Sequence, residues 1–559
     1  MGVPVEHEDS EITFEVDPLH YRHWALTIEA PVATLALRVT PDAGLRRDYE
    51  LKLNSYDLSV DIELHDIVQR LRFEHPEVHV VVVTGGIDKV FCAGANIQML
   101  AGSTHGHKVN FCKFTNETRN SIEEATAHSG QVWIAAVNGT AAGGGYELAL
   151  ACDEIVLVDD RASAVSLPEV PLLAVLPGTG GLTRVVDKRL VRRDLADVFA
   201  TRAEGVKGQQ ALDWGLVDAI ASRGQFDAVV LERARARAAT SYRPTAAGGL
   251  ALEPLGAEIT ADAWRYPFVD VEIDRSLGAA HITVRAPVGP PVATPEDLLD
   301  AGAAAWIVAG PRQLDDAMLR LRFNEPEIGT WVLHTRGDAD AVVAAEDLLR
   351  SHAEHWLVRE VALLWTRTLK RLDLSARTLV ALVEPGSCFT GVLAELALAA
   401  DRSYMLEGPD PEGDWPPATL RLTDANDGRF PMSNGLSRLA TRFWGRDERL
   451  ASARRRLDKD LLAADADELG LVTFTPDDLD WGDDVRLMLE ERNSFSPDAL
   501  TAMEANHRFV GPETVETKIF SRLTAWQNWV FQRPNAVGPD GALRRYGTGS
   551  RPTYDRART

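Results

Sequence analysis

The chain is poor in cysteine, and this shortage excludes two classes of protein. Only four cysteines occur among 559 residues, at Cys92, Cys112, Cys152 and Cys388. None lies in a CxxC or Cys/His spacing, and four are too few for a disulfide scaffold. We therefore expect a protein of the reducing cytoplasm without a metal site.

Excess positive charge and long apolar runs are also lacking. The formal net charge is -24 and the pI is near 5.1, which disfavours a nucleic-acid partner because phosphate binding needs a basic face. No run of apolar residues approaches the length of a membrane-spanning helix, and the acidic first ten residues contain no apolar stretch. Neither export nor a membrane partner is expected.

A run of glycines gives the strongest indication of chemistry. Gly143, Gly144 and Gly145 lead into an apolar helical segment that carries Glu147 in its first turn. A helix N-terminus offers unpaired N–H groups, and glycines let a ligand approach them closely. This pattern suits a reaction that builds negative charge on a carbonyl oxygen, with an acid or base beside it.

The sequence contains a diverged internal duplication. The segment from Leu71 (LRFEHPEVHVVVVTG) returns from Leu321 as LRFNEPEIGTWVLHT, and the helix ELALACD from Glu147 returns from Glu395 as ELALAAD. The order is preserved, and a third match follows both pairs. We infer two copies of one fold.

Each half shows an α/β pattern. In the first half we expect a helix over 61–73 and buried strands over 78–83, 133–137 and 154–158. Apolar strands of this kind imply an α/β sheet covered by helices on both faces. We predict a catalytic domain over 1–257, a degenerate copy over 258–491, and a C-terminal helical segment with a tail over 492–559. The polar tail from Asn535 is expected to be loose alone, or docked on a partner subunit.

Two further segments accompany the glycine run. The loop GGIDKVFCAGANI begins at Gly85, follows a predicted strand and leads into a helical segment. The segment SLPEVP places Glu169 22 residues after Glu147 and is followed by the turn LPGTGG from Leu176. Two loops and two carboxylates could thus surround one site.

These three segments resemble the crotonase (enoyl-CoA hydratase/isomerase) superfamily over residues of about 30 to 225. The resemblance implies a crotonase-like fold of repeated ββα units that binds acyl-coenzyme A thioesters. It implies that the N–H groups of Ala95 and Gly144 form the oxyanion hole and that Glu147 and Glu169 are the catalytic carboxylates. It also places Ala93, Gly94 and Gly143 at the substrate. No cofactor is implied, because coenzyme A belongs to the substrate.

Two other residues have both a functional and a plain interpretation. Cys112 lies on a helix that roofs the acyl pocket in this family and is a catalytic candidate that could orient water or a substrate oxygen, although a small core residue explains it equally well. Lys89 could meet a coenzyme A phosphate, but an exposed loop lysine is the commoner explanation. Cys92 and Cys152 are interpreted as packing residues.

The second half departs from the family pattern where chemistry would occur. Val392 stands three residues before Glu395 in place of a glycine, and no FCAGA segment follows the strand from Trp331. Thr423 occupies the position that corresponds to Glu169. We therefore predict that this half lacks the oxyanion cradle and that Glu395 is a relic of the fold or a helix-capping acid.

Segments outside those shared by the whole superfamily narrow the range of possible reactions. The segments LNSYDLSVD from Leu53 and VNFCKFTNETR from Val109, together with the fused degenerate copy, resemble a ring-cleaving branch of the superfamily. That branch implies a carbon-carbon lyase that adds water to 2,3-epoxy-2,3-dihydrobenzoyl-CoA and releases formate and 3,4-dehydroadipyl-CoA semialdehyde. Two alternatives are an aliphatic enoyl-CoA hydratase/isomerase and a non-catalytic acyl-CoA-binding scaffold. A homo-oligomer, expected to be a dimer, is also implied.

Overall fold

The computed structural model describes residues 11–559, which divide into two compact units. Residues 15–252 form the N-terminal unit, and residues 253–559 together with 11–14 form the C-terminal unit. The division falls a few residues before the boundary suggested by the sequence. Residues 492–559 group with the second unit, whereas the sequence suggested a separate segment.

The N-terminal unit is built on a six-stranded sheet of order β1-β2-β3-β5-β7-β9. Its strands are β1 (Trp24–Glu29), β2 (Val32–Leu37), β3 (Val80–Gly85), β5 (Val132–Val137), β7 (Glu154–Asp159) and β9 (Ala219–Ser222). β1 and β2 pair antiparallel, and the remaining pairs are parallel. All six residues of β5 are buried, which fits a sheet covered on both faces.

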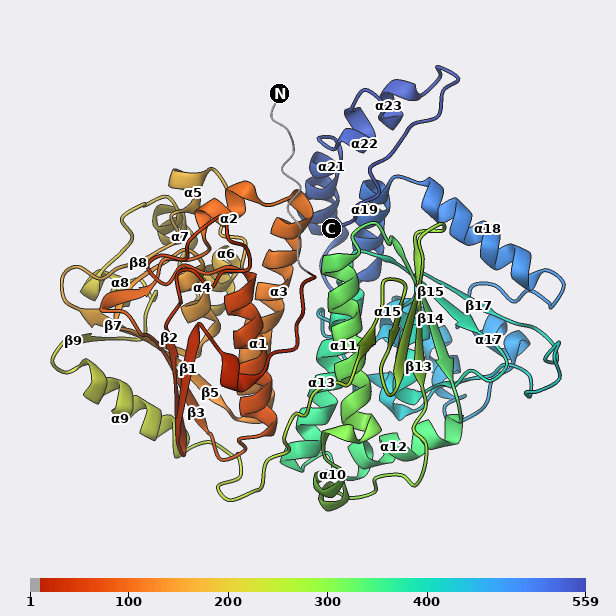
Figure 1. The fold of residues 1–559 in the computed structure, drawn as a ribbon, viewed down its shortest axis with the longest axis horizontal. Helices are drawn as coiled ribbons and strands as arrows, with labels where there is room; N and C mark the ends of the chain where they lie inside the picture. The colour runs from red at the N-terminus through yellow and green to blue at the C-terminus, as the bar shows by residue number, and fades with distance from the viewer. Residues whose placement is uncertain (1–10) are drawn as a thin grey trace. The chain divides into compact units, whose positions relative to one another are not determined.

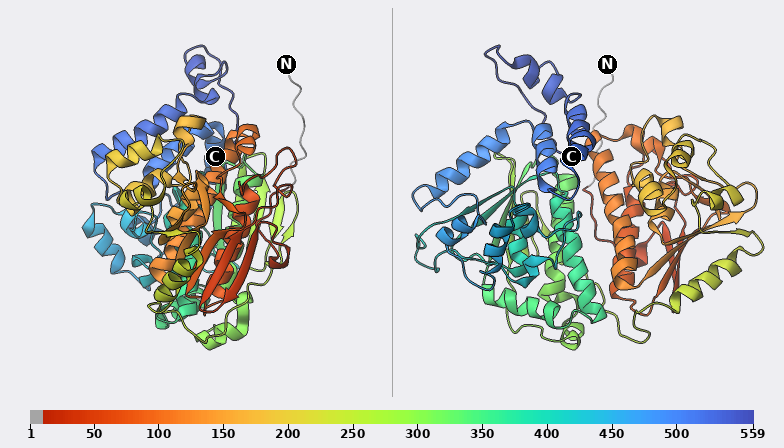
Figure 2. Two further views of the ribbon diagram at one scale, coloured as in Figure 1. Left: turned by 90° about the vertical axis from the view of Figure 1, so that its left-hand side faces the viewer. Right: turned by 180° about the vertical axis from the view of Figure 1, so that it is seen from behind.

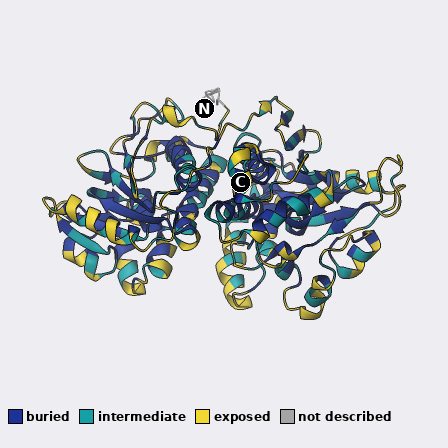
Figure 3. Cartoon of the chain, turned by 90° about the horizontal axis from the view of Figure 1, so that it is seen from below, coloured by how far each residue is buried: buried dark blue, intermediate teal, exposed yellow. Residues whose placement is uncertain are grey.

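Helices cover the two faces of this sheet (Figures 1 and 2). α9 packs its residues Phe226, Val230 and Ala234 on one face, while α1 and α3 pack together on the other side. The helices are α1 (Leu58–Phe73), α2 (Ile97–Gly102), α3 (His105–Glu124), α4 (Gly144–Ala151), α5 (Glu169–Leu173), α6 (Gly181–Thr183), α7 (Arg193–Ala200), α8 (Gly208–Asp213) and α9 (Phe226–Ala238). Figure 3 shows that the strands are largely buried and that exposed positions follow the outer helix faces.

The predicted elements of this unit are confirmed, with shifts at their ends. α1 begins at Leu58, before the predicted start at Asp61, because the carboxylate of Asp57 accepts a hydrogen bond from the Ser59 N–H and caps the helix.

A second, three-stranded sheet carries the loops of interest. It has the order β4-β6-β8, with β4 (Lys89–Cys92), β6 (Gly139–Ala142) and β8 (Val165–Ser166), and all its pairs are parallel. Parallel strands end at a common edge of their sheet. The loops that follow the three strands therefore leave from one edge.

The C-terminal unit repeats this plan. Its seven-stranded sheet has the order β10-β11-β12-β13-β14-β15-β17, in which the antiparallel pair β12/β13 is followed by parallel strands, as in the first unit. The strands are β10 (Glu258–Ile259), β11 (Ala263–Arg265), β12 (Val269–Asp274), β13 (Ala279–Arg285), β14 (Thr330–Arg336), β15 (Thr378–Val383) and β17 (Arg402–Met405), with a separate pair of β16 (Phe389–Thr390) and β18 (Leu420–Arg421). The duplication is thus visible in the topology.

The helices of this unit are α10 (Pro295–Ala301), α11 (Trp306–Asn324), α12 (Ala339–Ser351), α13 (Trp356–Asp373), α14 (Ala394–Ala399), α15 (Arg438–Arg442), α16 (Asp447–Arg454), α17 (Ala463–Leu469), α18 (Trp481–Ser494), α19 (Pro497–Arg508), α20 (Val515–Lys518), α21 (Thr524–Val530), α22 (Pro534–Val537) and α23 (Ala542–Arg545). The last five, α19 to α23, lie in the C-terminal helical segment that the sequence predicts over 492–559.

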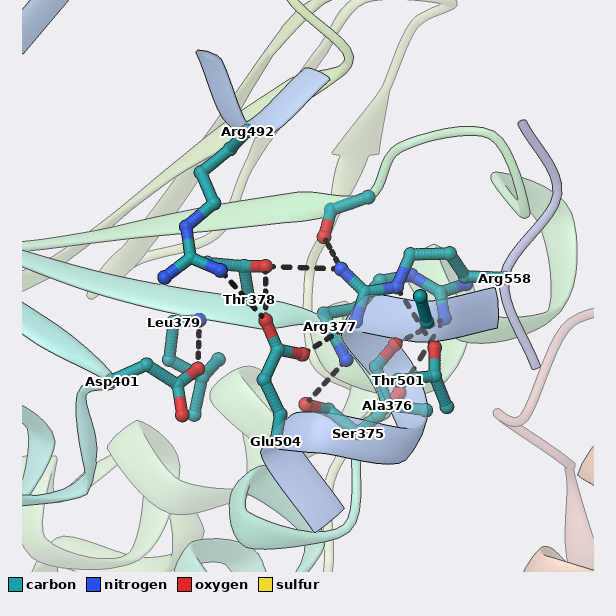
Figure 4. A network of polar contacts seen from close by, with 12 residues as sticks. Ser375, Ala376, Arg377, Thr378, Leu379, Asp401, Arg492, Thr501, Glu504 and Arg558 are labelled. Carbon is teal, nitrogen blue, oxygen red and sulfur yellow. Dashed lines mark hydrogen bonds and ion pairs between the residues drawn. The ribbon is translucent and has the colours of Figure 1, made fainter. Parts of the chain in front are cut away.

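A buried polar network attaches the end of the chain to this unit (Figure 4). Glu504 of α19 accepts hydrogen bonds from Thr378 of β15 and from Arg558, and Arg558 also donates to the Gly329 carbonyl at 2.8 Å. Asn535 is buried as well and donates to Asp498 at 2.9 Å. Asn535 and the last residues of the tail are thus held by buried groups of their own unit, while the segment between them, with Leu543 and Tyr546, is exposed, so docking of the tail on a partner subunit stays a prediction.

Candidate active site

The three segments singled out in the sequence meet at one edge of the small sheet. β4 leads into the loop 93–95, β6 into Gly143 and Gly144, and β8 into Glu169. The shared edge explains how residues up to about 75 positions apart in the chain come to surround one place.

The first two loops are in direct contact at glycines. Gly94 has a φ of +89°, and a Cβ there would lie 2.8 Å from the Ala142 carbonyl oxygen and 3.0 Å from the Gly144 nitrogen. Gly143 has a φ of +52°, and a Cβ there would lie 2.6 Å from Oε1 of Glu169. Both positions require glycine for conformation and for space.

In this arrangement the backbone N–H groups of Ala95 and Gly144 are available to donate hydrogen bonds to a ligand. The neighbours of Ala95 pair with Tyr56, whose N–H donates to the Gly94 carbonyl at 3.0 Å and whose carbonyl accepts from Asn96 at 2.8 Å. The Ala95 N–H therefore points away from Tyr56. Gly144 is the first residue of α4, where an N–H has no partner within the helix. Among residues 11–559, neither N–H has a hydrogen-bond acceptor.

Glu147 is buried and fixed by the turn that follows Glu169. Its Oε1 accepts hydrogen bonds from the N–H groups of Thr179, at 3.0 Å, and Gly181, at 2.7 Å, and its Oε2 accepts from the Thr179 hydroxyl. A Cβ on Gly181 would lie 2.9 Å from Oε1, so the close approach needs glycine. These contacts with Thr179 and Gly181 fix the position of both carboxyl oxygens.

Glu169 lies in a different environment. It is the first residue of α5, and its Oε2 is buried without a hydrogen-bond partner among the described residues. Burial, and secondly the negative charge of Glu147, raise the pKa of Glu169 to about 7. The two carboxylates therefore differ, since one is held by three donors and the other can carry a proton near neutral pH.

Cys112 lies close to the same turn. A Cβ on Gly178 would lie 3.4 Å from the Cys112 sulfur, and burial followed by the charge of Glu147 raises the pKa of the thiol to about 11. A thiol with this pKa stays protonated, so it can line the site or donate weakly but is not a thiolate nucleophile. A pocket role remains a prediction.

The remaining predicted residues have distinct positions. Ala93 is exposed at the first loop, whereas Lys89 is exposed at the opposite end of β4 from that loop. A contact between Lys89 and a coenzyme A phosphate stays a prediction. Cys92 is fully buried and its sulfur donates to the Asn54 carbonyl, as expected of a packing residue.

The sequence did not single out a buried network beneath the glycines. The Tyr56 hydroxyl accepts from Arg119 at 3.3 Å, and Arg119 pairs with Asp61 at 3.3 Å. A side chain on Gly144 would collide with the Tyr56 hydroxyl. Burial raises the pKa of Tyr56 well above its usual value, so its hydroxyl stays neutral. The roles of Thr179 and Gly181 were also missed, although their turn was recognised.

The counterparts in the C-terminal unit form a closed set of pairs. Glu395 is buried, accepts from Asn426 at 2.7 Å, and pairs with Arg438 at 2.9 Å. Arg438 also pairs with Asp373 at 2.7 Å. Such mutual pairing is typical of a structural role.

Comparison with known proteins relates this geometry to a family. The model of the enoyl-CoA hydratase/isomerase family matches residues 49–247. The benzoyl-CoA-dihydrodiol lyase of Aromatoleum evansii is 53% identical over 544 residues, which are 97% of this chain and 97% of that protein. The chain belongs to this lyase family within the enoyl-CoA hydratase/isomerase superfamily.

Solved structures resemble a smaller part of the chain. An enoyl-CoA hydratase from Geobacillus kaustophilus HTA426 is 33% identical and covers 39% of this chain and 75% of its own, with a TM-score of 0.34. An enoyl-CoA hydratase from Bacillus anthracis is 28% identical and covers 39% of this chain and 77% of its own, with a TM-score of 0.33. The match to the family model and to the full-length relative confirms the predicted crotonase fold class.

Proposed function

We propose that the chain is a lyase that opens the ring of 2,3-epoxy-2,3-dihydrobenzoyl-CoA. Two water molecules are consumed, and formate and 3,4-dehydroadipyl-CoA semialdehyde are released, in the aerobic coenzyme A-dependent degradation of benzoate. The main support is the 53% identity over nearly the full length of a benzoyl-CoA-dihydrodiol lyase. The open N–H groups and paired acids of the N-terminal unit supply the chemistry that this reaction needs.

The oxyanion hole is formed by the N–H groups of Ala95 and Gly144. Contact between the two loops at Gly94 supports a common target for both donors. Hydrogen bonds to the thioester oxygen let the carbonyl withdraw electrons from the conjugated ring, so water can add to the ring. After carbon-carbon scission, the same donors stabilise the resulting enolate.

The two carboxylates divide the proton transfers. Glu147 accepts hydrogen bonds at both oxygens and is the base that activates water. Glu169, with a pKa of about 7 and a free buried oxygen, delivers the proton to carbon or oxygen. After the first addition the base holds a proton and the acid has lost one, so the pair can exchange these roles in the second water addition.

Product analysis is the direct test. Purified protein is incubated with epoxidised benzoyl-CoA and, separately, with crotonyl-CoA, and formate and acyl-CoA products are quantified. Formate stoichiometric with substrate supports the proposal. Absence of formate together with rapid hydration of crotonyl-CoA would favour an aliphatic enoyl-CoA hydratase.

No metal, flavin or nicotinamide is needed for these steps. Turnover that is unchanged after dialysis against a chelator, in the absence of added cofactor, supports this part of the proposal. Loss of turnover that returns with a divalent metal would contradict it.

We also propose a cytoplasmic homodimer. Four free cysteines fit a reducing compartment, and no helix of the described residues is both long and apolar enough to cross a membrane. The C-terminal unit exposes several large apolar side chains near its end, a feature of subunit interfaces: Val515, Phe520, Leu523 and Phe531. Light scattering that gives twice the 61.2 kDa chain mass supports the dimer, and a monomer mass refutes it.

A further inference from the structure

The C-terminal unit retains part of the glycine cradle of the N-terminal unit. β16 ends at Thr390, and Gly391 follows with a φ of +51°, close to the +52° of Gly143 after β6. Glu395 lies four residues after Gly391, as Glu147 lies four residues after Gly143. Val392 thus stands at the position of Gly144, and its N–H corresponds to one proposed oxyanion donor. The two-donor cradle is absent, as predicted, but Gly391 preserves the backbone of its second half.

The retained donor is already occupied by a carboxylate of the same unit. Oε2 of Glu346 accepts a hydrogen bond from the Val392 N–H at 2.7 Å, and a Cβ on Gly391 would collide with this oxygen. Oε1 accepts from the Thr423 hydroxyl at 2.7 Å. Thr423 is the residue that replaces Glu169 in the duplicated pattern. In the N-terminal unit the corresponding N–H of Gly144 has no acceptor among the described residues.

Glu346 lies at this position because helix α12 occupies the place in the chain that β4 and the first donor loop have in the N-terminal unit. In the N-terminal unit β3 is followed by β4 and the donor loop that ends at Ala95. In the described part of the C-terminal unit, β14 is followed directly by helix α12, and β16 pairs only with β18. The helix that replaces the first donor loop carries Glu346, so one change removes a donor and supplies an anion.

Glu346 is held by hydrogen bonds and forms no ion pair among the described residues. Glu346 is 4% exposed, and its hydrogen-bond partners among the described residues are one backbone N–H and one hydroxyl. Arg429 acts on it only through space. Burial raises the pKa of Glu346 to about 7, as burial does for Glu169.

We propose that Glu346 is a built-in ligand that fills the relict oxyanion cradle of the C-terminal unit, and that this cradle is a binding site for small carboxylates when the side chain is removed. The cradle recognises a carboxylate through the Val392 N–H and the Thr423 hydroxyl. Its occupation by Glu346 leaves one open cradle per chain, in the N-terminal unit.

Chemical rescue tests this proposal on the full-length protein. Glu346→Ala should lower the melting temperature by several degrees, and 50–100 mM sodium formate should restore at least half of the loss, while sodium chloride at equal ionic strength restores much less. Glu346→Gln is the matched control. Its amide keeps the volume and one acceptor oxygen, so formate should stabilise it no more than chloride does.

A second substitution locates the rescue. Glu346→Ala combined with Thr423→Val removes one of the two donors, so formate rescue should fall at least threefold. Turnover should stay within twofold of wild type in every variant, because the N-terminal unit is untouched. Rescue of the double variant equal to that of Glu346→Ala would place formate elsewhere and refute the assignment.

Two other outcomes would overturn the proposal. One is a folded Glu346→Ala variant that formate stabilises no more than chloride. The other is a Glu346→Ala variant that does not fold even in formate, together with a Glu346→Asn variant that also does not fold in formate. The Asn side chain is shorter than that of Glu by one carbon. Failure of the proposed lyase activity would leave all these melting measurements interpretable.

Discussion

At the scale of single residues, the site separates two glutamates by their surroundings. Glu147 receives three hydrogen bonds from one turn, whereas Glu169 has a buried oxygen without a partner. A donor-rich setting favours charge, and a dry setting favours the neutral acid. This difference supports the proposed assignment of Glu147 as the base and Glu169 as the acid.

Loss of either carboxyl should abolish most turnover. Glu147→Gln and Glu169→Gln each keep the size of the side chain but cannot transfer a proton, so we expect kcat to fall by about 10²- to 10⁴-fold. The measurement is formate release by the purified variants, with circular dichroism to verify folding. Near-wild-type turnover in either variant would remove that residue from the mechanism.

The buried acid also has a cost in stability that depends on pH. The folded protein holds the Glu169 proton up to about pH 7, whereas the unfolded chain loses it near pH 4.5. Stability therefore falls as pH rises between these values and then stays lowered. Glu169→Gln should melt at a higher temperature than wild type at pH 8, and the difference should shrink toward zero near pH 4. A difference independent of pH would contradict the assigned shift.

At the scale of secondary-structure elements, the end of the chain is held by α19. Glu504 of this helix is buried and joined to Arg558 and to Thr378 of β15. Removing one partner of a buried ion pair leaves an uncompensated charge. The last residues are therefore part of the core of the C-terminal unit.

Arg558→Ala should destabilise that unit by about 3–5 kcal/mol, the usual effect of breaking a buried pair. The matched control is Arg545→Ala, which breaks the exposed pair with Asp540 and should cost at most about 1 kcal/mol. Denaturant unfolding of both variants measures the difference. Equal effects would show that the network in Figure 4 contributes little.

Local elements were predictable from the sequence, and their partners were not. The apolar strands β3 and β5 and the glycine-led helix α4 follow from composition and spacing. The donors on Thr179 and Gly181 were missed because a turn does not reveal the direction of its N–H groups. Glu346 was missed because it lies on an ordinary amphipathic helix, 46 residues before the Val392 that it contacts.

At the scale of the whole molecule, the two copies of the fold differ in the hydrogen bonding of their corresponding site residues. The N-terminal unit keeps N–H donors without acceptors and a buried oxygen of Glu169 without a partner, whereas the counterparts Val392 and Glu395 in the C-terminal unit are bonded to side chains of their own unit. Glu395 shows this contrast, since Arg438 and Asn426 occupy its oxygens. Chemistry is thus expected in one unit only.

Glu395→Gln should leave turnover within twofold of wild type while lowering the melting temperature by several degrees. The amide keeps the contact with Asn426 but removes the charge opposite Arg438, which retains Asp373. Turnover and thermal unfolding are measured on the same preparation. A 100-fold loss of kcat in a folded variant would show that the C-terminal unit takes part in the reaction.

The small sheet β4-β6-β8 positions the site loops by strand pairing and not by the length of the chain between them. The ladder of three short parallel strands fixes the separation of donors and acids, whatever length of chain connects them. The connection from β4 to β6, which contains α2, α3 and β5, can therefore differ in length or course between related chains while the paired ends of β4 and β6 keep the two loops together.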